Sequence, residues 1–290
     1  MSEAARTWTV MEMLAWTADW LKGKGFHNPR LNGELLLSGV LGLKRLDLYL
    51  QYDRPLRPEE VALFKERLLR RAKREPLQYI DGVAAFRDLR LAVDRRVLIP
   101  RPETETLVDE VLAWARGREG LHALDVGTGS GAIALALATE GPFARVVATD
   151  VEAGALEVAR ANHASAAPHA PVEFRQGDAY APVAGETFDV VVSNPPYVGL
   201  SERESLDAEV RDWEPASALF SGADGLDVVR RLVSGAPAVL RPNGLLAMEI
   251  GAEQGAAVAD LVRATAGFGE PRVLRDLAGR ERMVLADFGG

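Results

Sequence analysis

The stretch Leu124-Asp125-Val126-Gly127-Thr128-Gly129-Ser130-Gly131 decides the fold. An apolar strand runs into three glycines at alternate positions, and a helical pattern begins directly afterwards. Glycine allows a tight turn and lets a ligand lie against bare backbone, while the first turn of a helix presents unpaired N–H groups. We interpret the stretch as a ligand-binding turn between a strand and a helix.

The chain around this turn alternates between strands and helices. Strands are predicted at 121–126, 145–150, 172–175, 188–194, 244–250, 272–274 and 282–288, with helices near 130–139, 153–164, 222–237 and 253–265. Such alternation predicts an α/β fold, in which a mostly parallel sheet is covered on both faces. Only a short turn joins the last two strands, so we expect them to be antiparallel neighbours.

The N-terminal part has a different pattern. Apolar residues recur at helical spacing in 9–21, 31–41 and 58–74, which predicts a small helical bundle over residues 1–75. The third segment ends in the basic run 67–74, which is either a solvated helix face or a docking patch for a partner. Shorter apolar spacing predicts a β-hairpin linker over residues 76–100, followed by the main domain, residues 101–290.

Composition restricts the possible functions. A chain of 290 residues with 48% hydrophobic and 26% charged residues is typical of a globular protein, and it contains no apolar run of membrane-spanning length. We expect a cytoplasmic protein with no membrane partner. With Cys 0 and four scattered histidines, no metal site is expected. Residues 86–290 hold 20 basic against 31 acidic residues, a balance that predicts no stable nucleic-acid binding.

The glycines alone leave two other interpretations. Gly127, Gly129 and Ala132 also match the dinucleotide pattern G-x-G-x-x-A, and a glycine-rich turn can exist without any ligand. Asp125 argues against a dinucleotide, because a carboxylate beside a pyrophosphate is unfavourable. The same carboxylate suits a ligand that carries an ammonium and a sulfonium.

Two further carboxylates follow neighbouring strands. Asp150 ends the second predicted strand of the sheet, where it can accept hydrogen bonds from both hydroxyls of a ribose. Asp178 follows the third strand and can accept from an adenine amino group, although a loop aspartate can equally cap a helix. Together they predict a nucleoside ligand.

The chemistry is indicated by Ser193-Asn194-Pro195-Pro196-Tyr197, at the end of the fourth predicted strand. The prolines leave the Pro195 carbonyl rigid and free to accept, the Asn194 side-chain oxygen is a second acceptor, and Tyr197 offers a flat wall. Two converging acceptors can hold both hydrogens of an –NH₂ group and favour a transition state in which the nitrogen gains positive charge. The alternative is a Pro-Pro pair that only ends a strand.

These residues resemble the HemK/PrmC family of protein-glutamine N5-methyltransferases, which act on peptide chain release factors. The Asn-Pro-Pro-Tyr motif is shared with N6-adenine methyltransferases and with ribosomal-protein glutamine methyltransferases. The motifs that resemble the release-factor branch are Leu98-Ile99-Pro100-Arg101-Pro102-Glu103-Thr104-Glu105, Glu214-Pro215-x-x-Ala218-Leu219, Asp224-Gly225-Leu226 and Glu249-Ile250-Gly251. Residues 101–105 also suit a helix start, so their part in a site stays open.

The resemblance implies a seven-stranded class I (Rossmann-like) methyltransferase domain, a helical substrate-docking domain, S-adenosyl-L-methionine as methyl donor, and the glutamine of a Gly-Gly-Gln loop as acceptor. It implies donor contacts at Gly127, Thr128, Gly129, Ser130, Gly131, Asp150, Ala179 and Asn194. The acceptor contacts implied are Asn194, Pro195, Pro196 and Tyr197. Ala179 is small where relatives are often aromatic, so that contact is expected through backbone or from Tyr180. A non-catalytic donor-binding protein is the remaining alternative.

Overall fold

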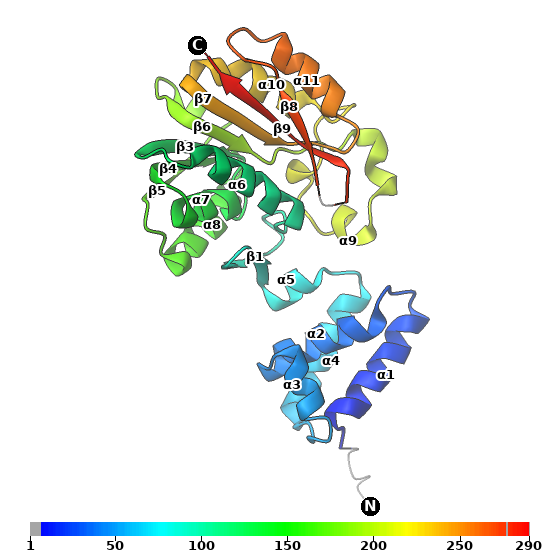
Figure 1. The fold of residues 1–290 in the computed structure, drawn as a ribbon. Coiled ribbons are helices and arrows are strands. Elements are labelled where there is room, and N and C mark those ends of the chain that lie inside the picture. Colours follow the sequence, from blue (N-terminus) through cyan, green and yellow to red (C-terminus); the bar gives the residue numbers. More distant parts are fainter. Residues whose placement is uncertain (1–6, 277, 290) are drawn as a thin grey trace, which may run out of the picture. The chain divides into compact units, whose positions relative to one another are not determined.

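The computed structural model describes residues 7–276 and 278–289 and divides into two compact units (Figure 1). Unit 1 combines the chain up to Gly82 with the short segment Ala208–Trp213, and unit 2 combines Val83–Asp207 with the chain from Glu214 onward. Within the described residues no helix is long and apolar enough to cross a bilayer. The same residues contain no group of three or more acidic or histidine side chains that could hold a metal ion.

Unit 1 is helical, as predicted. Its helices are α1 (Val10–Gly23), α2 (Pro29–Leu41), α3 (Arg45–Leu50), α4 (Pro58–Ala72), α5 (Leu77–Asp81) and α9 (Ala208–Arg211). Thr9 begins α1 with a capping box, in which its side chain accepts from the Glu12 N–H and the Glu12 carboxylate accepts from the Thr9 N–H. The buried side chains of α1, α2 and α4, among them Leu14, Leu37 and Phe64, form the core of this unit.

One prediction for the linker is wrong. Leu77, Tyr79 and Ile80, which the sequence pattern assigned to a β-hairpin, lie in helix α5, and Gly82 ends this helix in the left-handed conformation at φ 72°. The hairpin itself exists but is shorter, with strands β1 (Val83–Phe86) and β2 (Leu89–Ala92). Apolar residues three apart suit one helical turn as well as a strand, and length alone could not separate the two.

The basic run 67–74 is used within unit 1. The guanidinium of Arg67 pairs with Asp81, that of Arg70 with Glu75, and that of Arg74 donates to the carbonyls of Lys24 and Gly25. Arg71 is buried and donates to Asn32 Oδ1 at 2.6 Å, to the Glu75 carbonyl at 2.9 Å and to Glu209 Oε1 at 2.6 Å. These arginines hold the helical unit together, which leaves fewer free charges for a docking patch.

We expect Arg71→Ala to lower the free energy of unfolding of unit 1 by roughly 3–5 kcal/mol, because it leaves a buried amide oxygen and a carboxylate without their donor. Arg45→Ala is the control, since Arg45 is largely exposed and Glu34 keeps Arg30 as a partner; its loss should cost less than about 1 kcal/mol. Urea unfolding of both variants measures the difference. Equal losses from both substitutions would mean that the buried contacts of Arg71 contribute no more to the free energy of unfolding than an exposed ion pair does.

Unit 2 contains the seven-stranded sheet that the sequence predicts. The strands are β3 (Leu121–Val126), β4 (Phe143–Asp150), β5 (Val172–Gln176), β6 (Phe188–Ser193), β7 (Leu240–Glu249), β8 (Arg272–Arg275) and β9 (Glu281–Phe288). Their order is β5-β4-β3-β6-β7-β9-β8. Strands β3 to β7 are parallel, β9 is antiparallel to β7, and β8 and β9 are antiparallel neighbours as expected.

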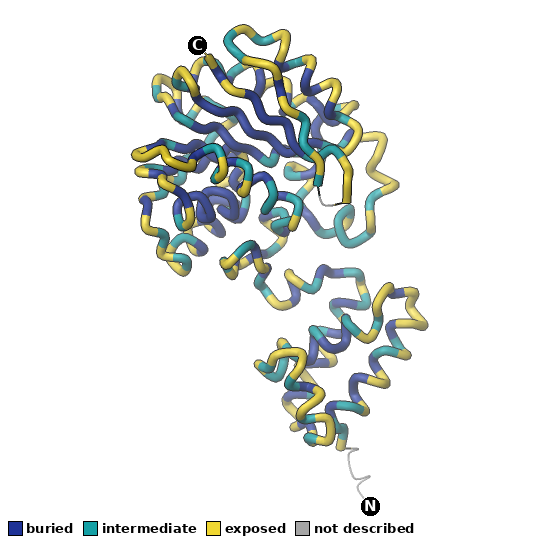
Figure 2. Tube along the Cα trace, viewed as in Figure 1, coloured by how far each residue is buried: buried dark blue, intermediate teal, exposed yellow. Residues whose placement is uncertain are grey.

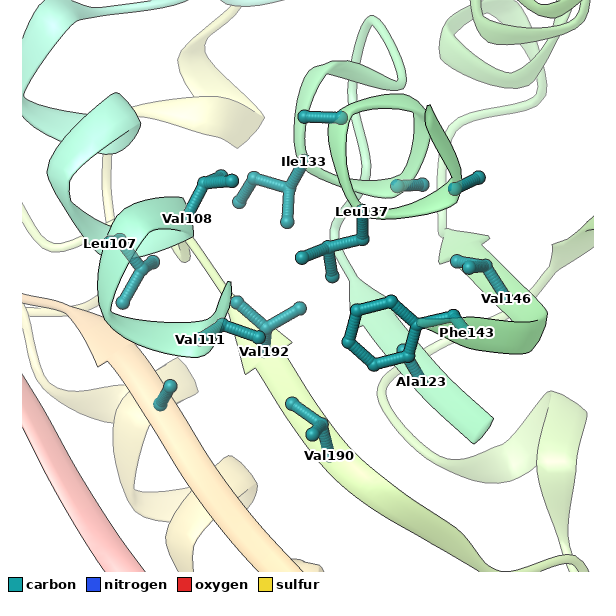
Figure 3. Close-up of a cluster of buried hydrophobic side chains, with 14 of the residues drawn as sticks. Leu107, Val108, Val111, Ala123, Ile133, Leu137, Phe143, Val146, Val190 and Val192 are labelled. Atoms are coloured by element: carbon teal, nitrogen blue, oxygen red, sulfur yellow. The ribbon is translucent and has the colours of Figure 1, made fainter. Parts of the chain in front are cut away.

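Helices cover both faces of this sheet, and the strands between them are buried (Figure 2). The core on one face brings α6 (Pro102–Ala115) and α7 (Ala132–Glu140) against the strands, with Val111 and Leu137 directed toward Val192 (Figure 3). Helix α8 (Ala153–Ala166) packs over β4 and β5 beside α7. On the other face lie α10 (Asp227–Gly235) and α11 (Gly255–Arg263).

A buried asparagine ties the hairpin to the glycine turn. Asn162 in α8 accepts from the Ala92 N–H at 2.6 Å, and its Nδ2 donates to the carbonyls of Ala92 at 3.0 Å and Ser130 at 2.9 Å. All hydrogen-bonding groups of the amide are thus directed at the end of β2 and at the turn. The hairpin is therefore fixed beside the predicted ligand site.

Candidate functional site

The carboxyl ends of the parallel strands meet at one edge of the sheet, where ligands of open α/β sheets bind. Val126, Thr149 and Ser193 lie side by side there in adjacent strands, and Asp150 ends β4. A cavity of about 410 Å³ opens at this edge, a volume in the range of small-molecule sites. Its walls belong to unit 2 and include Phe86, Arg96, Pro100, Thr104, Gly127, Thr128, Gly129, Ser130, Asp150, Asp178, Ala179, Asn194, Pro195, Pro196, Phe220, Val228, Arg231 and Leu232.

The glycine turn presents bare backbone to this cavity. Gly127 and Gly129 have φ values of +75° and +55°, and a Cβ atom at either would meet no atom within 4 Å, so the space beside them is open. Gly131 serves packing instead, since a Cβ there would lie 3.3 Å from the Cβ of Ala159. The carbonyl of Thr149 accepts from the N–H groups of Gly127 and Thr128, each at 2.9 Å, and fixes the turn.

Asp150 lies where the sequence predicts it, in the cavity wall. Its Oδ2 accepts from the Gly129 N–H and its Oδ1 from the Glu152 N–H, each at 2.9 Å. Burial raises its pKa, while the backbone N–H groups act in the opposite direction. A carboxylate offers about four lone-pair positions, so two remain for the hydroxyls of a ligand.

Asp125 lies behind the glycine turn and is fully buried. It does not line the cavity; its Oδ2 accepts from the Thr128 hydroxyl at 2.6 Å and from the Ala134 N–H at 3.1 Å. Its other oxygen has no hydrogen-bond partner among the described residues. Burial raises the pKa of Asp125 to about 7, and the nearby charge of Asp150 adds to the effect.

This raised pKa predicts how stability depends on pH. The carboxyl of an unfolded aspartate titrates near pH 4, so between roughly pH 4 and pH 7 the folded chain binds more protons at Asp125, and its contribution to stability falls as pH rises. Asp125→Asn removes the cost of ionisation. We expect the variant without ligand to have a higher Tm than the unmodified protein at pH 8 and a much smaller advantage at pH 5. A Tm difference that does not change with pH would contradict the assignment.

Asp178 and Ala179 both line the cavity, but their side chains differ in what they can do. The exposed carboxylate of Asp178 pairs with Arg231 Nη1 at 2.5 Å. Ala179 has a positive φ of 46° and brings its backbone to the wall. Tyr180 is turned away from the cavity, because its hydroxyl donates to the Leu232 carbonyl at 2.8 Å and its ring packs against Gly235. Of the two expected contacts at this position, only the backbone one is available.

The Asn-Pro-Pro-Tyr segment follows β6 at the same edge. Asn194, Pro195 and Pro196 line the cavity, whereas Tyr197 lies behind them and donates through its hydroxyl to Glu249 Oε1 at 3.1 Å. Asn194 Nδ2 donates to Thr104 Oγ1 at 3.0 Å. The nitrogen end of this amide is thereby engaged, so its oxygen is the polar atom left for a ligand.

Two residues of this network, Thr104 and Glu249, were not predicted as site residues. Thr104 lies in the first turn of α6 and Glu249 ends β7, and the Thr104 hydroxyl donates to Glu249 Oε2 at 2.6 Å. Burial raises the pKa of Glu249, while hydrogen bonds from Thr104 and Tyr197 act in the opposite direction. Both residues stand in the quoted motifs, which was the available signal, but nothing in the sequence pairs positions so far apart.

Comparison with known proteins decides the family. Residues 12–82 match the PrmC N-terminal domain, and residues 104–209 match the methyltransferase small domain. The release factor glutamine methyltransferase of Geobacter sulfurreducens is 43% identical over 290 residues, which is 100% of each chain. That of Moorella thermoacetica is 43% identical over 278 residues, covering 96% of this chain and 98% of the relative.

This chain belongs to the family of release factor glutamine methyltransferases. Among solved structures, a methyltransferase from Pyrococcus furiosus has a TM-score of 0.53 at 21% identity and covers 78% of this chain and 98% of its own. That likeness shows the fold alone. It agrees with the predicted α/β class and with the seven-stranded sheet of unit 2.

In this member of the release factor glutamine methyltransferase family, two of the quoted motifs shape the walls of the cavity. Buried Glu214 pairs with Arg101 Nη2 at 2.5 Å and accepts from the Ile99 N–H, which joins the chain before α6 to the loop that begins with Pro215. Gly225 lies against the segment after Asn194, since a Cβ there would come within 2.2 Å of the Tyr197 carbonyl oxygen. Both motifs therefore act by holding loops in place.

Proposed function

We propose that this protein transfers a methyl group from S-adenosyl-L-methionine to the side-chain amide nitrogen of a glutamine, and that the glutamine lies in the Gly-Gly-Gln loop of a peptide chain release factor. The observation that carries this proposal is the orientation of Asn194, whose amide nitrogen is engaged by Thr104 so that its oxygen is left for a ligand, next to Pro195 in the cavity wall. An –NH₂ group held by both oxygens has its lone pair directed away from them. The family and its relatives support the choice of substrate.

The residues at the glycine turn fit the methyl donor. Open space beside Gly127 and Gly129 allows close approach to backbone, and the Asp150 carboxylate has lone pairs for ribose hydroxyls. The Asp150 carboxylate in the cavity wall would favour a ligand that carries positive charge, whereas Asp125 lies behind the turn and would act through Thr128 and the backbone. When bound, the donor supplies an electrophilic methyl group. We infer donor contacts from Gly127 to Ser130, Asp150, the backbone at Ala179, and Asn194, with Gly131 supporting the turn by packing. The side chain of Asp178, whose Oδ2 pairs with Arg231, is a further candidate for an adenine amino group.

With the donor held at the glycine turn and Asp150, its methyl group would pass to the acceptor nitrogen held by Asn194 and Pro195, and the sulfur would keep the electron pair of the broken carbon–sulfur bond. An amide nitrogen is a weak nucleophile because its lone pair is delocalised, and it gains positive charge as the new bond forms. The oxygens of Asn194 and Pro195 would stabilise that charge, and Pro196 would limit where the acceptor lies. The surplus proton becomes acidic on the methylated nitrogen and can leave to water, so these residues need not act as a base.

The helical domain, predicted as residues 1–75 and followed by the linker 76–100, is proposed to dock the release factor. A protein substrate needs a contact surface larger than one glutamine side chain, and the domain 101–290 holds the chemistry. A substrate that works in translation would place the enzyme in the cytoplasm.

The test offers each candidate acceptor the same labelled donor. We expect label on the release factor, and none on DNA, RNA or ribosomal protein, which are the acceptors of the methyltransferases that share the Asn-Pro-Pro-Tyr motif. A release factor whose Gly-Gly-Gln glutamine is replaced by glutamate should remain unlabelled, because a carboxylate has no amide nitrogen. Label on nucleic acid, or on the substituted release factor, would refute the proposal.

A further inference from the structure

We propose that Thr104 and Glu249 are positioning residues that fix which end of the Asn194 amide faces the acceptor nitrogen. The inference rests on the proposed function, because it explains how the Asn194 oxygen is kept available. It adds two residues from distant elements, the first turn of α6 and the end of β7, to the reaction.

The direction of the hydrogen bonds follows from Glu249. Glu249 accepts a hydrogen bond at each of its oxygens, from the Thr104 hydroxyl at 2.6 Å and from the Tyr197 hydroxyl at 3.1 Å. A threonine hydroxyl has a single hydrogen, and Thr104 donates it in the hydrogen bond to Glu249. The Thr104 oxygen can then only accept, and it accepts from Asn194 Nδ2 at 3.0 Å.

This arrangement excludes the flipped amide. If the Asn194 amide turned by half a rotation, its oxygen would face a hydroxyl oxygen whose hydrogen is already engaged, and two acceptors would be in contact. The flipped amide would also direct N–H groups at the hydrogens of the acceptor –NH₂ group. Thr104 is 4% exposed and Glu249 1% exposed, so water cannot easily replace either partner.

The surroundings keep the carboxylate in place. Burial raises the pKa of Glu249, while the hydrogen bonds from Thr104 and Tyr197 and the positive charge of Arg282 act in the opposite direction. Its two oxygens are held separately by Thr104 and Tyr197, which prevents the carboxylate from rotating. Tyr197 is therefore connected to Asn194, three residues earlier in the same motif, through Glu249 and Thr104.

A double-mutant cycle tests the inference. Thr104→Val keeps the shape of the side chain but removes the hydroxyl, and we expect single-turnover methyl transfer to release factor to slow by roughly 10- to 30-fold at saturating donor. In an Asn194→Ala background the same change should cost less than about twofold, because the amide through which Thr104 acts is gone. Thr104→Ser retains the hydroxyl and should recover most of the rate.

Thr139→Val is the matched control. Its hydroxyl is buried in α7 and has no hydrogen-bond partner among the described residues, so transfer should continue at the unmodified rate. An equal loss from Thr104→Val in both backgrounds would indicate a merely structural role and would overturn the inference. So would a Thr104→Val enzyme that transfers at the unmodified rate.

A second readout needs neither turnover nor a variant that folds poorly. NMR can measure how fast the two hydrogens on Asn194 Nδ2 exchange with solvent in the unmodified protein. The hydrogen donated to Thr104 should exchange at least about tenfold more slowly than the other hydrogen on the same nitrogen. The two signals are assigned through their loss in Asn194→Ala. Fast exchange of both hydrogens would overturn the inference. Absence of any transfer to release factor would refute the proposed function instead, while the exchange measurement still decides the orientation.

Discussion

Replacing Asn194 with alanine is expected to slow single-turnover methyl transfer by roughly 10²–10³-fold, the loss typical of a preorganised hydrogen bond to developing charge. The side chain contributes one of the two acceptors, and Thr104 holds its nitrogen end. The fold should survive, because β6 before it and the two prolines after it are unchanged. Donor binding should change far less, since the glycine turn and Asp150 remain.

The experiment on Asn194 needs two measurements on one protein. Transfer is measured at saturating donor and release factor, and donor affinity is measured by titration calorimetry. A variant that transfers near the unmodified rate would contradict the two-acceptor mechanism. The mechanism is also wrong if the variant fails only because it no longer binds the donor.

Replacing Asp150 with alanine is expected to weaken donor binding at least tens-fold. Two charge-assisted hydrogen bonds to ribose hydroxyls would be lost, each contributing roughly 1.5–3 kcal/mol. The variant also loses the acceptor of the Gly129 N–H and of the Glu152 N–H, so the glycine turn is held less firmly. Both effects act in the same direction.

Asp189→Ala is the matched control for Asp150. Asp189 lies near the opposite end of β6, where its carboxylate pairs with Arg241 and accepts from the His122 N–H. Calorimetry should find donor affinity unchanged in this control. Equal losses in the two variants would mean that Asp150 acts on the stability of the sheet and not on the ligand.

The glycine turn and the strand before it could be predicted because their signals are local. β3 begins and ends at the predicted residues, since a mostly apolar stretch ends directly in glycine. β7 begins at Leu240. The sequence predicted a later start, at residue 244, because Pro242 and Asn243 are typical of a turn. α10 begins only at Asp227, since Gly222 and Gly225 before it adopt positive φ values of 74° and 79°.

The Asn194 network shows why part of the site could not be predicted. Asn194 and Tyr197 belong to one short segment whose residue types indicate the chemistry. Their partners Thr104 and Glu249 are 145 residues apart in the chain and meet only because α6 and β7 reach the same edge of the sheet. Asp178 was predicted as a ligand contact, but its carboxylate pairs with Arg231, and nothing in the sequence near Asp178 indicates this ion pair.

The measurement that tests the central claim most directly is tandem mass spectrometry of a release factor incubated with this protein and S-adenosyl-L-methionine. We predict one added methyl group, located on the side-chain nitrogen of the glutamine in the Gly-Gly-Gln loop. We predict none when the release factor is incubated with Asn194→Ala for the time that the unmodified protein needs for one turnover. A methyl group on another residue, or on a backbone or oxygen atom, would contradict the account.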